Sequence, residues 1–176
     1  MFMYEKYGQF IDGKWQPSEN NETYEVINPA TEEIIGEASK ATHVDVDKAL
    51  KSAEKGLEVW KKTPPWQRSY IIRRIADKMR EKQDVLAKWM TLEVGKPFAE
   101  AKGEVGGSAD IFEWNAEETK RIYGQTVESR FVDTRVHVYY QPVGVVAALT
   151  PWNFPLVLSA RKISTALAAG CSVIIK

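Results

Sequence analysis

Hydrophobic and polar residues alternate at the start of the chain, and there they predict β-structure. Residues 9–15 alternate around Asp12-Gly13, a dipeptide typical of tight hairpin turns. A second turn is expected at 28–31, where Asn-Pro-Ala-Thr occurs, followed by a short strand over 33–37. The chain is therefore expected to open with an extended arm.

Apolar residues recur at helical spacing between residues 42 and 124, and four helices are expected there. The first begins at Thr42, which forms a capping-box pattern with Asp45. Gly95 is expected to end the third helix. The fourth is expected over 97–123, although two adjacent glycines inside it weaken helical propensity.

The hydrophobic period changes again after residue 124. Residues 129–140 alternate, which predicts one extended strand partly exposed to solvent. The run 145–149 is apolar on both faces, as a strand inside a parallel sheet would be. A loop, a helix over 155–169 and a strand over 172–176 then complete a βαβ unit. The overall pattern predicts an α/β protein.

Composition and charge narrow the classes of partner and location. Twenty-four basic residues balance twenty-four acidic ones, so no net field recruits nucleic acid or an anionic membrane. No apolar run is long enough to span a membrane, and residues 1–10 lack a signal-peptide pattern. The single cysteine excludes an internal disulfide framework. These features favour a cytoplasmic protein.

Two polar residues follow the strands of the βαβ unit. Asn153 comes after the first strand and Lys176 ends the second, and ligands of parallel sheets bind beyond these carboxyl ends. The Asn153 amide could donate to an oxyanion, and Lys176 could hydrogen-bond ribose hydroxyls or phosphates. From spacing alone, the simpler interpretation of both as solvated or capping groups is favoured.

Other chemically suggestive residues are expected to be structural. Cys171 lies between a helix-ending glycine and an apolar strand, where burial disfavours the thiolate that a nucleophile needs. His43, Asp45 and Asp47 alternate like metal ligands, but they span a helix start, where acidic residues are favourable. His137 falls on an exposed strand. No metal site is expected.

Two motifs at a fixed separation carry a family resemblance. They are Gly-Val-Val-Ala-Ala-Leu-Thr-Pro-Trp-Asn-Phe-Pro at 144–155, and Ala-Leu-Ala-Ala-Gly-Cys at 166–171 leading to Lys176. With the segments 10–15, 28–31 and 93–97, they make the whole chain resemble the N-terminal portion of the NAD(P)-dependent aldehyde dehydrogenases.

The resemblance implies a fold in three segments. Residues 1–124 would form an N-terminal arm and the helical bundle of a Rossmann-type cofactor domain. Residues 125–142 would form a projecting oligomerisation hairpin, and residues 143–176 the first βαβ unit of that domain. A homodimer or homotetramer is implied, without a choice between the two.

The resemblance also implies roles for individual residues. Asn153 matches the asparagine that helps to hold the thiohemiacetal oxyanion beside the nicotinamide. The backbone of Thr150, Pro151 and Trp152 matches the segment that lines the nicotinamide side of the site. Lys176 matches the lysine that contacts the adenosine ribose and, in NADP users, its 2′-phosphate. The cofactor that the resemblance implies is therefore NAD or NADP.

The substrate implied is a small aldehyde, oxidised to its carboxylic acid through a cysteine thioester. Residues 112–124 and Arg161-Lys162 resemble the succinate-semialdehyde dehydrogenase branch. There the arginine matched by Arg161 contacts the substrate carboxylate, a role that suits a guanidinium. The alternative is that Arg161 pairs with a nearby acid. Glutarate semialdehyde and lactaldehyde stay open as substrates.

The family's nucleophilic cysteine and general-base glutamate match no position here and would lie beyond residue 176. The isolated chain is therefore expected to be inactive. An apolar strand over 172–176 with nothing to cover it favours the front portion of a larger enzyme. A non-catalytic cofactor-binding or oligomerisation module is the alternative.

Overall fold

The arm at the start of the chain consists of two small antiparallel hairpins. The computed structural model describes residues 8–176. The first seven residues of the predicted segment 1–124 lie outside the described residues. So does most of the stretch 1–10, which lacks a signal-peptide pattern. Strands β1 (Gln9–Ile11) and β2 (Lys14–Gln16) pair through a turn in which Asp12 and Gly13 both have positive φ. The predicted hairpin is confirmed.

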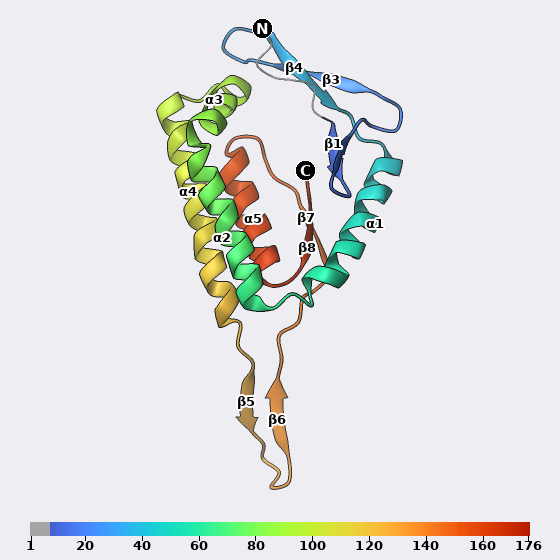
Figure 1. The fold of residues 1–176 in the computed structure, drawn as a ribbon, viewed down its shortest axis with the longest axis vertical. Helices are drawn as coiled ribbons and strands as arrows, with labels where there is room; N and C mark the ends of the chain where they lie inside the picture. The colour runs from blue at the N-terminus through green and yellow to red at the C-terminus, as the bar shows by residue number, and fades with distance from the viewer. Residues whose placement is uncertain (1–7) are drawn as a thin grey trace.

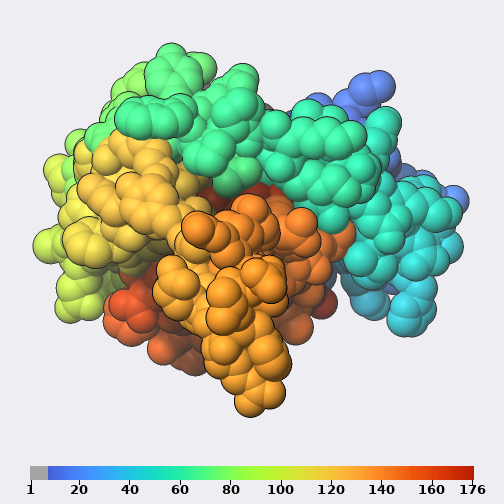
Figure 2. Space-filling model, turned by 90° about the horizontal axis from the view of Figure 1, so that it is seen from below, coloured from blue at the N-terminus to red at the C-terminus, as the bar shows by residue number. Residues whose placement is uncertain are grey.

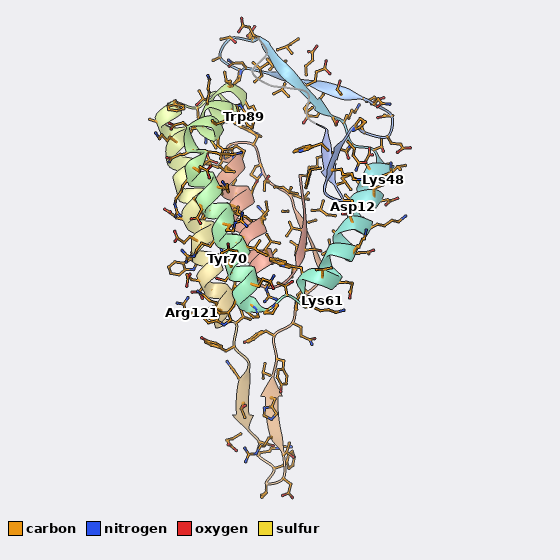
Figure 3. The ribbon with its side chains drawn as sticks, in the orientation of Figure 1. Asp12, Lys48, Lys61, Tyr70, Trp89 and Arg121 are labelled. Carbon is orange, nitrogen blue, oxygen red and sulfur yellow. The ribbon has the colours of Figure 1, made fainter. Side chains whose placement is uncertain are left out.

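The second hairpin pairs β3 (Thr23–Ile27) with β4 (Ile34–Ser39). The strand expected at 33–37 is therefore confirmed, but its partner was not expected from the sequence. Strand β3 has no buried residue on either face. It is therefore not the half-buried kind of strand that an alternation of apolar and polar residues identifies. The β1–β2 turn lies beside the first helix, with Asp12 and Lys48 on the same side of the molecule (Figure 3).

The four expected helices are confirmed. They are α1 (His43–Trp60), α2 (Pro65–Glu81), α3 (Gln83–Val94) and α4 (Phe98–Glu118). Helix α4 continues through Gly106 and Gly107 because Val105 and Ala109, on either side of them, are fully buried. It ends earlier than expected, and a 3-10 turn, Thr119–Arg121, follows it.

The core lies where α2, α4 and α5 (Pro155–Ala168) pack side by side (Figure 1). Ile72 of α2 and Phe112 of α4 are its large buried side chains, and Ala109, Ala116 and Ala160 let the helices approach closely. Burying a side chain the size of Ile72 stabilises the fold by about 1.5–3 kcal/mol. The packing of these helices fixes where α5 begins.

A two-stranded hairpin projects away from the helices (Figure 1). Strands β5 (Gln125–Glu128) and β6 (Arg135–Val138) pair antiparallel, and every residue of both is exposed. The single strand predicted over 129–140 is therefore wrong, because residues 129–134 form the connecting loop. That loop is held by bonds from the Phe131 N–H to Ser129 Oγ and from the Thr134 N–H to the Phe131 carbonyl.

The last stretch of the chain is the expected βαβ unit. Strands β7 (Val145–Ala148) and β8 (Ser172–Ile175) pair in parallel, and α1 and α5 lie on opposite sides of the pair (Figure 1). The expected burial on both faces is not observed, since Leu149 is 65% exposed and Ile175 is 50% exposed. Within residues 8–176 no third strand joins β7 and β8. Among these residues no helix is long and apolar enough to cross a membrane.

Candidate functional site

The carboxyl ends of β7 and β8 are joined by backbone hydrogen bonds beyond the strands themselves. The Lys176 N–H donates to the Ala148 carbonyl, and the Thr150 N–H donates to the Lys176 carbonyl, both at 3.0 Å. Thr150 Oγ1 also lies 3.4 Å from the Lys176 carbonyl oxygen. Residues 150 and 176 therefore occupy one edge of the parallel pair.

The loop that leaves this edge exposes most of its side chains. Trp152 is 78% exposed, and Pro151 and Asn153 are exposed as well. Thr150 is half-buried, with its hydroxyl 3.5 Å from Ser159 Oγ on α5. The structure thus brings together five of the six residues singled out from the sequence: Thr150, Pro151, Trp152, Asn153 and Lys176.

Arg161 is the predicted site residue that lies apart from this edge. It follows the first residue of α5 by six positions, which corresponds to about 9 Å along the helix axis. Its side chain is exposed, and none of the ion pairs formed within residues 8–176 includes it. The alternative of a helix charge paired with a nearby acid therefore finds no support in the described stretch of the chain.

Two residues not singled out from the sequence hold the loop in place. The Lys96 ammonium donates to the Asn153 carbonyl at 3.1 Å, lies 4.2 Å from the centre of the Phe154 ring and pairs with the Glu104 carboxylate. Glu104 Oε1 accepts hydrogen bonds from the first turn of α5. We call these two residues the Lys96–Glu104 pair.

Local sequence explains where this lysine lies. Gly95 ends α3 with φ of +76°, and a Cβ there would approach Pro29 Cγ to 2.9 Å, so only glycine fits without displacement. Pro97 precedes the first residue of α4. Lys96 is therefore held at a tight corner between two helices. A signal for its partner was present in the sequence, because Glu104 stands beside apolar positions on the face of α4 that packs inward.

The same carboxylate makes the start of α5 unsuitable for a phosphate. Glu104 Oε1 accepts from the N–H groups of Leu156 at 3.0 Å and Val157 at 3.1 Å. Helix N-termini commonly bind anions through such free N–H groups. Here the Glu104 carboxylate already accepts hydrogen bonds from two of these N–H groups.

The remaining candidates are placed as expected for structural residues. Cys171 is 2% exposed, and its N–H donates to the Ala166 carbonyl at 2.9 Å within the turn that ends α5. His43 is exposed at the start of α1. Within residues 8–176, no group of three potential ligands from His, Cys, Asp and Glu is placed to hold a metal ion.

Comparison with known proteins decides the family. A sequence model of the aldehyde dehydrogenase family matches residues 15–176. This chain belongs to the aldehyde dehydrogenase family. The likeness to its N-terminal portion that the two sequence motifs indicated is confirmed, as is the mixed α/β fold.

Individual family members match nearly the whole chain. A glutarate-semialdehyde dehydrogenase of Pseudomonas aeruginosa is 46% identical over 95% of the chain and 35% of its own length. An NADP-dependent succinate-semialdehyde dehydrogenase of Escherichia coli, GabD, is 44% identical over 94% of the chain and 34% of its own. The chain therefore spans about a third of the length of these relatives.

A solved structure gives the same correspondence in three dimensions. A betaine aldehyde dehydrogenase of Staphylococcus aureus, crystallised with NAD+, superimposes with a TM-score of 0.93 at 34% identity. The match covers 96% of this chain and 34% of that one. The helical bundle, the hairpin and the βαβ unit described above are thus arranged as in an aldehyde dehydrogenase.

The exposed edge of β7 and β8 has groups that suit a dinucleotide. An amine at Lys176, an indole at Trp152 and an amide at Asn153 all lie on one loop and the adjoining strand end. Parallel sheets bind nucleotides at this end of their strands. The residues present therefore fit NAD or NADP.

Proposed function

We propose that the protein carrying this sequence oxidises a short semialdehyde to its carboxylic acid with NAD or NADP. The observation that carries the proposal is the shared edge of β7 and β8 in a chain of this family, where Thr150 and Lys176 are hydrogen-bonded through their backbones and Asn153 follows on the same loop. Similarity to an NADP-dependent relative and to an NAD+-bound structure supports both cofactors.

Each residue of the edge has a distinct role in this proposal. Lys176 donates to ribose hydroxyls, and the backbone of Thr150, Pro151 and Trp152 lines the nicotinamide side. Bound NAD(P) supplies the acceptor for the hydride. The Asn153 amide donates to the aldehyde oxygen as negative charge develops there, and a fixed donor of this kind lowers the barrier to the reaction.

The cysteine nucleophile and the general-base glutamate are assigned to segments outside residues 1–176. The single cysteine of this chain, Cys171, is buried away from the proposed edge and is not a candidate. The 176-residue chain on its own is therefore expected to produce no NAD(P)H from an aldehyde. Binding of the cofactor without oxidation would agree with the non-catalytic alternative for this segment alone.

Arg161 is proposed to contact the far carboxylate of the substrate. Its guanidinium is exposed and forms none of the ion pairs seen in residues 8–176, so it is available for a bidentate contact. Two similar relatives are named for glutarate and succinate semialdehyde, and both compounds carry a carboxylate opposite the aldehyde. The proposed substrate class is therefore the short semialdehydes, which carry one aldehyde and one carboxylate.

Assembly through the β5–β6 hairpin completes the proposal. The hairpin extends past the outline of the helices when the molecule is seen from below (Figure 2), with Lys61 and Arg121 on either side of its base (Figure 3). An isolated two-stranded hairpin is marginal in water. Its apolar residues are exposed: Val127, Phe131, Val132, Val136, Val138, Tyr139 and Tyr140. A homo-oligomer in the cytoplasm, in which the hairpin segment of 125–142 meets a neighbouring copy, would cover them.

A substrate panel tests the function. The complete protein is assayed with succinate semialdehyde, glutarate semialdehyde, lactaldehyde and an uncharged aliphatic aldehyde, each with NAD+ and NADP+. The expected result is a kcat/KM at least about tenfold higher for the two carboxylate-bearing semialdehydes, a discrimination of about 1.4 kcal/mol. Equal rates for charged and uncharged aldehydes would refute the substrate class, and no NAD(P)H from any of them would refute the activity.

A further inference from the structure

One lysine at the α3–α4 corner makes two contacts with the loop carrying Asn153 and a third with Glu104 of α4. The Lys96 ammonium donates to the Asn153 carbonyl, packs over the Phe154 ring and pairs with Glu104. The Lys96 side chain is 11% exposed and that of Glu104 only 3%. The ion pair is therefore largely shielded from solvent, whereas Asn153 and Phe154, which Lys96 contacts on the loop, are exposed.

Glu104 joins this lysine to the first turn of α5. Its Oε2 accepts from Lys96, while its Oε1 accepts from the backbone N–H groups of Leu156 and Val157. These N–H groups have no partner within the helix itself. One carboxylate thus links the α3–α4 corner, the loop and α5.

The Lys96–Glu104 pair is better explained by the positions that it imposes on its neighbours than by a contribution to the stability of the fold. Removing two charges from water costs about as much free energy as their attraction returns, so a buried pair adds little to net stability. Hydrogen bonds to charged groups are short and directional, and a cation over a ring also has a defined position. The contacts of Lys96 and Glu104 therefore restrict where the loop backbone lies.

We propose that Lys96 and Glu104 are positioning residues that set the Asn153 amide at the cofactor edge. The inference rests on the proposed function of Asn153. Lys96 fixes the Asn153 carbonyl and Glu104 fixes the first turn of α5, so the backbone is held from the residue that bears the amide to the start of the helix. A displacement of about 1 Å at a reacting group can lower a rate by about 100-fold.

Four substitutions separate the components of this arrangement. Lys96→Met removes the bond to Asn153, whereas Lys96→Arg keeps a cation that can still donate. Glu104→Gln keeps an oxygen for the N–H groups of α5 but removes the charge opposite Lys96, and Glu104→Ala removes both. The matched controls are Glu100→Gln on α4 and Lys88→Met on α3, since both residues are exposed.

The first readout is independent of activity. In NMR spectra of the complete protein, Lys96→Met is expected to shift the Asn153 carbonyl ¹³C resonance, and Lys88→Met is expected to leave it unchanged. Glu104→Ala is expected to speed amide exchange at Leu156 and Val157 at least about tenfold, because their acceptor is lost, while Glu104→Gln stays closer to the parent. An unmoved Asn153 resonance in Lys96→Met would overturn the inference.

The second readout is the kinetics of the complete protein. Lys96→Met and Glu104→Ala are expected to lower kcat at least about tenfold, with KM for aldehyde and Kd for NAD(P) within about threefold of the parent. Lys96→Arg is expected to recover at least about a third of kcat. A lower Tm with unchanged kcat would show a purely structural role and overturn the inference. If the unsubstituted protein oxidises no aldehyde, the proposed function fails, and the NMR result alone decides whether the pair positions the loop.

Discussion

Asp45 connects the N-terminal arm to the first helix, and its charge should contribute a measurable share of the stability. Its carboxylate accepts from the Thr42 N–H and hydroxyl, both at 2.9 Å, and from the Glu19 N–H at 3.1 Å. The side chain is buried. The Thr42 backbone N–H, with the Glu19 N–H and the Thr42 hydroxyl, lowers the pKa of Asp45 from 3.8 to about 2, against the opposing effect of burial.

The size of the effect follows from this pKa. A carboxyl with a lowered pKa in the folded state stabilises the protein above its unfolded pKa, and the contribution disappears as pH falls through the folded pKa. The shift corresponds to about 2 kcal/mol at pH 7, about half of that at pH 3 and a few tenths near pH 2. Asp45→Asn should therefore cost about 2 kcal/mol at neutral pH and progressively less in acid.

Urea unfolding of the 176-residue chain and of Asp45→Asn at several pH values between about 7 and 2.5 measures this difference. Asp47→Asn is the control, because Asp47 is an exposed acid in the same helix. Its substitution should change stability by less than about 0.5 kcal/mol. A cost of Asp45→Asn that stays constant across this pH range would refute the reasoning, since it would show that the charge contributes nothing.

Three further outcomes are expected. Ile72→Ala should lower the free energy of unfolding by about 2–5 kcal/mol in urea titration, because Ile72 is fully buried between helices, and a loss below about 1 kcal/mol would contradict that packing. Arg161→Met should raise KM for succinate semialdehyde at least about tenfold and leave KM for an uncharged aldehyde unchanged in steady-state assays; equal changes would remove Arg161 from the substrate site. Val132→Asp should reduce the mass of the complete protein in light scattering, because Val132 is fully exposed on the hairpin and a charge there would be buried on assembly. An unchanged mass would exclude the hairpin tip from the interface.

Local patterns predicted much of the fold because they are set by neighbouring residues. The Thr42–Asp45 capping box, the Asp12-Gly13 turn and the glycine at 95 depend on dihedral angles and bonds within a few residues, and all three are observed. The edge formed by β7 and β8 could be located for a similar reason. A βαβ unit places the ends of its two strands together whatever surrounds it.

Features that depend on distant contacts were not predicted. Residues 129–140 alternate in the sequence, but both faces of the hairpin are exposed, so alternation could not show where the chain turns back. The roles of Lys96 and Glu104 depend on the meeting of α4 with a loop far along the chain, which no local pattern encodes. Only the presence of a carboxylate on a buried helix face indicated that a partner was needed.

Substitution of Asn153 by alanine in the complete protein is the most direct test that this edge supports aldehyde oxidation. Removing one oxyanion donor should lower kcat by about 100- to 1,000-fold, while the Kd for NAD(P), measured by fluorescence titration, stays within about threefold of the parent. Full activity of Asn153→Ala with succinate or glutarate semialdehyde would contradict the assignment of Asn153.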